Sequence, residues 1–180
     1  MISSRSRFLR AIQPLLTSVR RILAPPALEV KSMTDTEKSD IVRKMYEKEK
    51  TNFPEVEDIS PTSAQALYEK GEAVFIDVRT PDEQIVSMLP GAVTEQDVAD
   101  TPSLLQGKTA MAYCTIGYRS GLYAEDQGRE GIRVLNVQGG ILAWVFSGGK
   151  VYHAGRETSR VHVYEEEWNY LPDGYEPVMF

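Results

Sequence analysis

The chain has very little cysteine or histidine. Its 180 residues include one cysteine, Cys114, and two histidines, His153 and His162. A single cysteine excludes an intramolecular disulfide, and these three residues do not recur at the spacings that structural zinc sites use. We therefore expect a fold that is held by its core alone, with no bound metal.

Long hydrophobic runs are also missing. No apolar stretch approaches the roughly 20 residues that a membrane-spanning helix requires. Apolar residues make up 42% of the chain and charged residues 26%, which is ordinary for a soluble globular protein. The sequence therefore predicts one folded domain with extensions and no membrane span.

Acidic residues are absent from the first 28 residues, which contain five arginines. The rest of the chain holds 15 of the 20 basic residues and all 26 acidic ones, so its body is a poor match for nucleic acid. The Arg-rich, Ser-containing segment 1–30 is typical of an organellar transit peptide, and we expect a mitochondrial location, with a plastid as the alternative. If this segment is instead a disordered or partner-binding basic arm, we expect the protein in the cytoplasm.

The middle of the chain alternates between two kinds of pattern. Residues 31–58 predict a helical extension and linker, with a surface helix that has Thr34 or Thr36 as N-cap and a thin apolar stripe of Ile41, Met45 and Val42. After that, the expected strands are "AVFIDVR", "TAMAYC" and "IRVLNV", and the expected helices are "SPTSAQALYEKG", "TPDEQIVSML", "SGLYAEDQG" and "GGILAWVFSGG". Such alternation predicts an α/β fold, with a mainly parallel sheet and helices on both of its faces.

Residues 154–180 are rich in aromatic side chains. They include Tyr164, Trp168, Tyr170, Tyr175 and Phe180. We expect this C-terminal extension to pack on the domain, because so much aromatic surface is costly to leave in water. Its segment "RVHVY" is expected to add an edge strand to the sheet.

Cys114 lies in the stretch "YCTIGYRSG", where a predicted strand ends. Ligands of α/β sheets gather at this end of the strands. Gly117 permits a positive φ, successive backbone N–H groups of a tight loop form an anion-binding nest, and a helix expected to begin near Ser120 adds its dipole. Arg119 adds forked donors for an oxyanion. These features favour a nucleophilic thiolate, so we predict a reactive cysteine and not a packing residue.

Four blocks of the sequence resemble the rhodanese family over about residues 60–150: "FIDVRTPDEQ", "LPGAV", "CTIGYRSG" and "LNVQGGILAWVFSGG". The resemblance implies a rhodanese-like domain over residues 59–153, without a cofactor, that transfers sulfur through a persulfide on Cys114. It implies substrate binding by the loop residues Thr115, Ile116, Gly117, Tyr118, Arg119 and Ser120. The donor would be a small molecule such as thiosulfate, and the acceptor cyanide, a small thiol or the thiol of a partner protein.

Two other functions remain open. The phosphatase and arsenate-reductase branches of this fold carry five residues between cysteine and arginine, whereas four intervene here, which favours a sulfur atom over a tetrahedral oxyanion. A non-catalytic rhodanese-like binding module would need neither Cys114 nor Arg119. Asp77 and Arg79, at the end of the first predicted strand, are expected to brace the loop as an ion pair or through hydrogen bonds, with direct substrate contact as the alternative.

Overall fold

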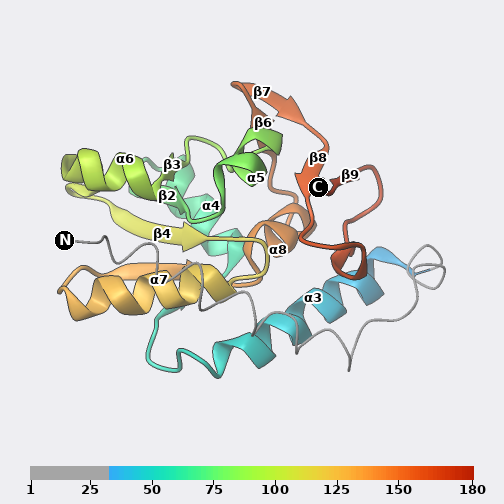
Figure 1. Cartoon of the computed structure of the whole chain (residues 1–180), viewed down its shortest axis with the longest axis horizontal. Helices are drawn as coiled ribbons and strands as arrows, with labels where there is room; N and C mark the ends of the chain where they lie inside the picture. The colour runs from blue at the N-terminus through green and yellow to red at the C-terminus, as the bar shows by residue number, and fades with distance from the viewer. Residues whose placement is uncertain (1–32) are drawn as a thin grey trace.

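The structure is a computed structural model that describes residues 33–180 (Figure 1), so the predicted transit peptide or basic arm, residues 1–30, lies outside the described residues. A five-stranded sheet occupies the centre, in the order β1-β5-β4-β2-β3. Its strands are β1 (Asp58–Ile59), β2 (Ala73–Asp77), β3 (Val93–Thr94), β4 (Thr109–Tyr113) and β5 (Val134–Val137). All four pairings are parallel, which confirms the predicted α/β class.

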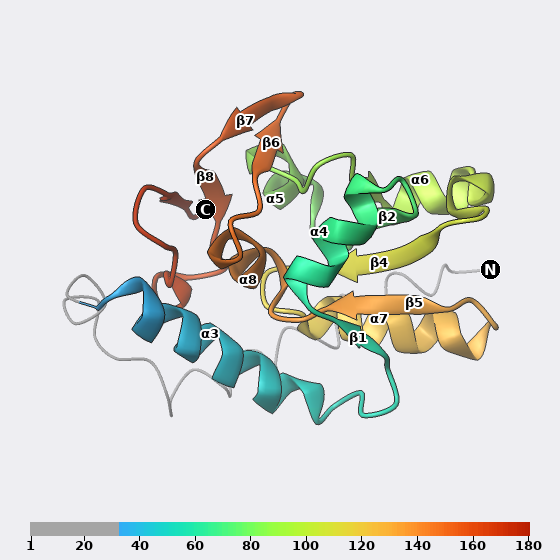
Figure 2. The same ribbon diagram turned by 180° about the vertical axis from the view of Figure 1, so that it is seen from behind.

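Helices cover both faces of this sheet. Helices α4 (Pro61–Glu69) and α8 (Gly140–Phe146) pack on one face, and α6 (Glu95–Asp100) and α7 (Tyr118–Arg129) pack on the other. Helix α5 (Pro81–Val86) and the short 3₁₀ helix η1 (Pro102–Leu105) follow β2 and α6 in the chain. Phe75 and Met111 share one core cluster with residues of α4 and α8. Their neighbours Ile76 and Ala112 share a second cluster with residues of α6 and α7, because successive strand residues point to opposite faces. Figure 1 shows α7 in front of the sheet, and Figure 2 shows α4 in front from behind.

Helix α3 (Asp35–Lys50) precedes the sheet and packs against α7 and α8. It begins with a capping box, in which Thr34 accepts from the Glu37 backbone and Glu37 accepts from the Thr34 backbone. The sequence predicted this helix, but as a surface helix with only a thin apolar stripe. Val42 and Tyr46 are 1% and 5% exposed, so this helix belongs to the core.

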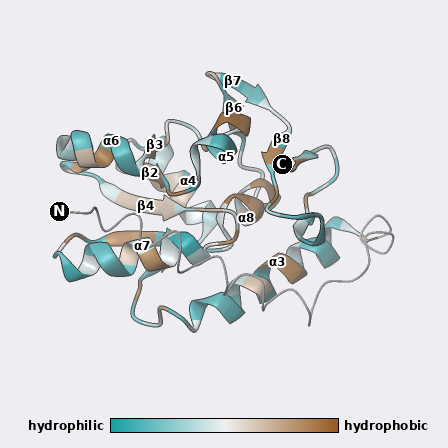
Figure 3. Ribbon diagram, in the orientation of Figure 1, coloured by the Kyte–Doolittle hydropathy of each residue, from teal (hydrophilic) through white to brown (hydrophobic). Residues whose placement is uncertain are grey.

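Residues 151–180, which include the predicted C-terminal extension 154–180, form two small sheets of their own. They consist of the hairpin β6 (Val151–His153) with β7 (Arg156–Thr158), and β8 (Arg160–His162) paired in parallel with β9 (Glu176–Val178). The predicted edge strand "RVHVY" is therefore wrong, since β8 pairs with β9 and does not join the central sheet. Val161, Trp168 and Tyr170 lie in the core cluster of α4 and α8. Figure 3 shows the hydrophobic colour of β6, β8 and α8, and Val151 of β6 and Val161 of β8 lie in the same core cluster as α8.

Within residues 33–180, no helix combines the length and the apolar character that crossing a membrane requires.

Candidate active site

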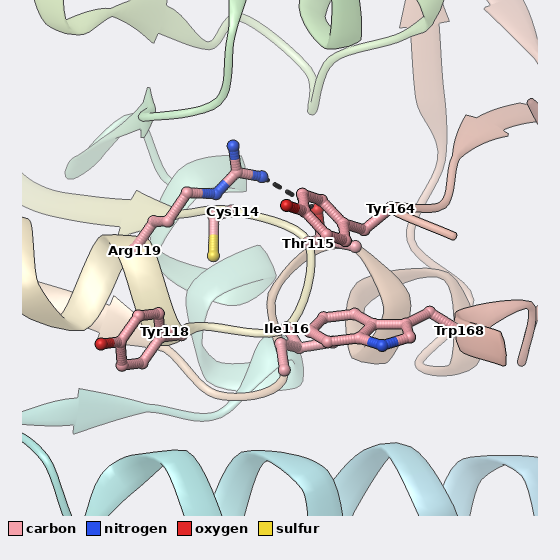
Figure 4. A pocket seen from close by; sticks show the side chains of 7 residues that line it. All are labelled: Cys114, Thr115, Ile116, Tyr118, Arg119, Tyr164 and Trp168. Carbon is pink, nitrogen blue, oxygen red and sulfur yellow. Dashed lines mark hydrogen bonds between the residues drawn. The ribbon is translucent and has the colours of Figure 1, made fainter. Parts of the chain in front are cut away.

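Cys114 follows β4 directly, at the carboxyl edge of the sheet. Its side chain is 1% exposed, and Figure 4 shows its Sγ among the side chains that line a small pocket. The backbone N–H of Gly117 donates a hydrogen bond to Sγ over 3.2 Å. Because Gly117 is the N-cap of α7, the positive end of this helix lies at the sulfur. A donor and a helix N-terminus at the sulfur are the surroundings in which proteins stabilise nucleophilic thiolates.

The turn at Gly117 is fixed from two sides. Its φ of 97° is the positive value that the sequence predicted, and only glycine adopts it without strain. A Cβ added there would lie 2.6 Å from a ring carbon of Tyr46 in α3. From β5, the side-chain amide of Asn136 donates to the Gly117 carbonyl over 3.0 Å and to the Tyr46 hydroxyl over 3.1 Å. The loop that holds Cys114 is therefore positioned by both α3 and β5.

Arg119 is already paired, which the sequence did not predict. Its Nη1 and Nη2 donate to the two carboxylate oxygens of Glu83 over 2.7 and 2.8 Å. Nη2 also donates to the Thr115 hydroxyl over 3.1 Å. The side chains of Arg119 and Glu83 are 13% and 4% exposed, so solvent screens this pair little.

The protonation of this pair follows from its contacts. Burial would raise the pKa of Glu83, but its contacts with Arg119, His162 and the Thr80 backbone together outweigh burial and hold that pKa well below its usual range. Burial would lower the pKa of Arg119, and the bonds to Glu83 raise it instead. Both groups therefore stay charged, and removal of one partner of such a buried pair costs about 3–5 kcal/mol.

Glu83 connects three parts of the chain. It stands at the third position of α5, where its Oε2 accepts from the Thr80 backbone N–H and hydroxyl over 2.9 and 3.0 Å. On its other side, Nδ1 of His162 in β8 lies 3.4 Å from its Oε1, an ion-pair distance when the ring is protonated. The sequence does not predict Glu83 as a residue of this site. The Thr80-to-Glu83 spacing is a capping-box signal, and it predicts only the helix start.

Asp77 and Arg79 form a second buried ion pair. Nη2 of Arg79 donates to Oδ2 of Asp77 over 2.7 Å and to the Ser87 carbonyl over 2.5 Å. The Tyr113 hydroxyl donates to the same Asp77 oxygen over 2.5 Å. Neither charged side chain has any exposed area, so the pair braces the chain between β2 and α5 and does not reach the pocket.

Ser120 takes a different role from the predicted one. Its hydroxyl donates to Oδ1 of Asn136 over 2.7 Å, and the residue has no exposed area. It therefore supports the loop from the side of β5 and does not line the pocket, contrary to the predicted substrate contact.

Two parts of the chain line the pocket at Cys114. Its lining consists of Cys114, Thr115, Ile116, Tyr118 and Arg119 from the loop and the start of α7, and of Tyr164 and Trp168 from the C-terminal extension (Figure 4). The rings of Tyr164 and Trp168 have their centroids 5.5 Å apart. The cavity volume of this pocket is about 10 Å³, which is near the lower limit for holding one water molecule. The sequence predicted that the extension packs on the domain, but not that it lines this pocket.

In the part of the chain that the structure describes, no cluster of three or more His, Cys, Asp or Glu side chains could hold a metal ion.

Comparisons with known proteins place the Cys114 loop inside a matched domain. A family model described as rhodanese-like domain matches residues 60–147. The thiosulfate sulfurtransferase of Pseudomonas aeruginosa is a similar solved structure, with 20% identity and a TM-score of 0.52 over 64% of this chain and 23% of that chain. At this identity the likeness shows the fold.

Two further solved structures are similar over most of their own length. A rhodanese-related protein from Thermoplasma volcanium has 26% identity and a TM-score of 0.44 over 53% of this chain and 97% of that chain. A protein of unknown function from Rhodopseudomonas palustris, described as a possible tyrosine phosphatase, has 24% identity and a TM-score of 0.49 over 62% and 93%. A search of curated proteins found no match.

The family model covers the segment from the start of α4 to the end of α8, and the Cys114 loop lies within it. Residues 60–147 are therefore a rhodanese-like domain.

Proposed function

We propose that this protein is a sulfurtransferase that carries a sulfane sulfur as a persulfide on Cys114. The observation that supports this most is the placement of the only thiol in the chain. Its Sγ accepts a hydrogen bond from Gly117 at the N-terminus of α7 and lies on a pocket with room for about one small atom or molecule. Cys114 would be the nucleophile in the first half of the reaction and the leaving group in the second.

The chemistry needs two displacements at sulfur. In the first, the Cys114 thiolate attacks the outer sulfur of a donor such as thiosulfate, the new S–S bond forms, and the electron pair of the old S–S bond leaves with sulfite. In the second, an acceptor thiolate or cyanide attacks the outer sulfur of the Cys114 persulfide. The Cys114 thiolate leaves, and the product is a new persulfide or thiocyanate. Anionic nucleophiles carry out both steps, so neither step requires a general base.

The acceptor is proposed to be a thiol, either of a small molecule or of a partner protein. The persulfide would sit at the surface pocket between the loop and the aromatic residues Tyr164 and Trp168, where a second thiol must approach it. The small space beside Sγ supports a sulfur atom as cargo. A phosphoryl group would need more room and free donors, and Arg119 is occupied by Glu83.

The test measures sulfur transfer and aryl phosphate hydrolysis in the wild type and in Cys114→Ser. We expect the wild type to form thiocyanate from thiosulfate and cyanide, or a persulfide from a donor and a thiol. We expect the variant to form neither product. Aryl phosphate hydrolysis should be undetectable at the same protein concentration. Faster hydrolysis of aryl phosphate than sulfur transfer would move the protein to the phosphatase branch. Absence of every activity would favour the binding module.

A further inference from the structure

The pocket at Cys114 contains a single basic side chain in the part of the chain that the structure describes, and its charge is already matched. That side chain is Arg119, and no other residue of the lining is basic. Both outer nitrogens of its guanidinium donate to the carboxylate of Glu83 over 2.7 and 2.8 Å. The side chain that the sequence offers as an anion binder is therefore neutralised inside the protein.

The charged groups around this pair do not restore a positive pocket. Arg79 is fully buried and paired with Asp77. His162 faces Glu83 from β8 and adds a charge only when its ring is protonated. The N-terminus of α7 contributes about half a positive charge, but Gly117 directs this end of the helix at Sγ of Cys114. A thiolate at Cys114 would balance that charge itself, and a dianion approaching it would be repelled.

Apart from Thr115, whose hydroxyl accepts a hydrogen bond from Arg119, the rest of the lining is apolar or aromatic. Ile116 and Tyr118 come from the loop and from the first residue of α7, and Tyr164 and Trp168 close the pocket from the C-terminal extension. Such surfaces favour a carbon chain over a sulfonate, because an ionic group loses its water there without gaining a partner.

We propose that Glu83 is the specificity-determining residue of this pocket: by neutralising Arg119 it selects sulfur donors of low charge, such as alkyl persulfides, over dianionic thiosulfate. The inference rests on the proposed function and narrows its donor class. With such a donor, the Cys114 thiolate attacks the outer sulfur of R–S–SH. A new S–S bond forms between Cys114 and the outer sulfur, and the S–S bond of the donor breaks. R–S⁻ leaves with the electron pair of that bond, and the proton stays on the transferred sulfur.

The charge at the pocket can be measured without any sulfur donor. Cys114 is the only thiol, so its alkylation by anionic iodoacetate and by neutral iodoacetamide can be followed by intact mass. For the wild type, we expect the ratio of the two rates to lie at or below that of a free thiol such as N-acetylcysteine. In Glu83→Gln the unmatched Arg119 should raise this ratio about tenfold, the lower end of the rate effects of charged clefts. A structural change that only exposes Cys114 would change the rates with iodoacetate and iodoacetamide by the same factor and leave their ratio unchanged.

The matched control is Asp82→Asn. Asp82 precedes Glu83 in the first turn of α5 and is exposed, so this variant removes one negative charge from the same turn. We expect its ratio to equal that of the wild type. An equal rise in both variants, or no rise in Glu83→Gln, would overturn the role of Glu83.

If Glu83→Gln does not fold, the salt dependence of the wild-type alkylation rate tests the proposal without it. If Arg119 is neutralised, added salt should leave the iodoacetate rate unchanged or raise it, because screening removes repulsion. A marked fall of that rate with salt would show an open positive charge in the pocket and refute the proposal.

The donor preference is measured separately from the activity itself. Persulfide formation on Cys114 is followed with thiosulfate and with 2-hydroxyethyl persulfide, whose stem is uncharged. A persulfide from either donor supports the proposed function, whereas its absence with both refutes that function. The inference concerns the change in preference: Glu83→Gln should increase the rate with thiosulfate relative to the persulfide about tenfold. An unchanged relative rate would refute the inference and leave the proposed function standing.

Discussion

The ring of Tyr46 packs directly on the backbone of Gly117, so that an added Cβ would lie 2.6 Å from one of its carbons. Tyr46 belongs to α3, which precedes the segment matched by the family model, whereas Gly117 lies inside the Cys114 loop. An element outside the rhodanese-like domain thus holds the loop in the conformation that points a backbone N–H at Sγ.

This contact predicts that Gly117→Ala destabilises the protein and slows persulfide formation. The left-handed backbone alone costs a non-glycine residue roughly 1–2 kcal/mol, and the methyl group must also displace Tyr46. Urea unfolding measures the first effect, and the rate of the mass increase with a sulfur donor measures the second. Gly128→Ala is the control, because a Cβ at that helical position meets nothing within 4 Å. Equal stability of the two variants would contradict the prediction.

The pair of Glu83 and Arg119 predicts a specific dependence of stability on pH. The pKa of Glu83 is lowered in the folded protein, so its contribution is fully present above the ordinary carboxyl pKa of 4.5 and is lost as the pH falls below it. At pH 7 we expect the wild type to exceed Glu83→Gln in free energy of unfolding by about 3–5 kcal/mol. Below pH 4.5 this difference should shrink by up to about 1.4 kcal/mol for each pH unit.

Urea unfolding at a series of pH values from 7 to 3 would measure that difference. Other carboxylates titrate over the same range in both proteins, so subtracting one curve from the other isolates Glu83. A difference that stays constant, or grows toward low pH, would show that Glu83 is not held as a carboxylate by Arg119.

The aromatic side of the pocket predicts an effect of Trp168→Ala. Trp168 is 7% exposed and lines the pocket at Cys114 together with Tyr164, so its removal should cost about 3–5 kcal/mol of stability. It should also speed the reaction of Cys114 with a bulky maleimide more than its reaction with small iodoacetamide. Phe180→Ala is the control, since Phe180 is 72% exposed and does not line the pocket. If both variants react like the wild type, the extension does not cover Cys114.

Much of the Cys114 loop could be predicted because residues close in the sequence determine its conformation. The strand that ends at Cys114, the glycine with positive φ and the helix that follows lie within a few residues of one another. Only details of the boundaries differed, since α7 begins at Tyr118 and not near Ser120. Neighbouring residues set these features through backbone sterics and hydrogen bonds, so a short stretch of sequence contains them.

The partners of the loop could not be predicted, because they come from distant segments. Glu83 carries a capping-box signal and gives no sign of its bidentate contact with Arg119, which depends on how α5 lies beside the loop. Trp168 follows no periodic pattern that would mark a pocket residue. The strand β8 was predicted as an edge of the central sheet, but its pairing with β9 depends on a return of the chain that no local signal announces.

The central claim is that Cys114 carries the transferred sulfur, and intact mass tests it most directly. After incubation with excess thiosulfate or 2-hydroxyethyl persulfide, the wild type should gain the mass of one sulfur atom. Dithiothreitol should remove that mass, and Cys114→Ser should never acquire it. A wild-type mass that stays unchanged with both donors, in a protein whose Cys114 still reacts with iodoacetamide, would contradict the account.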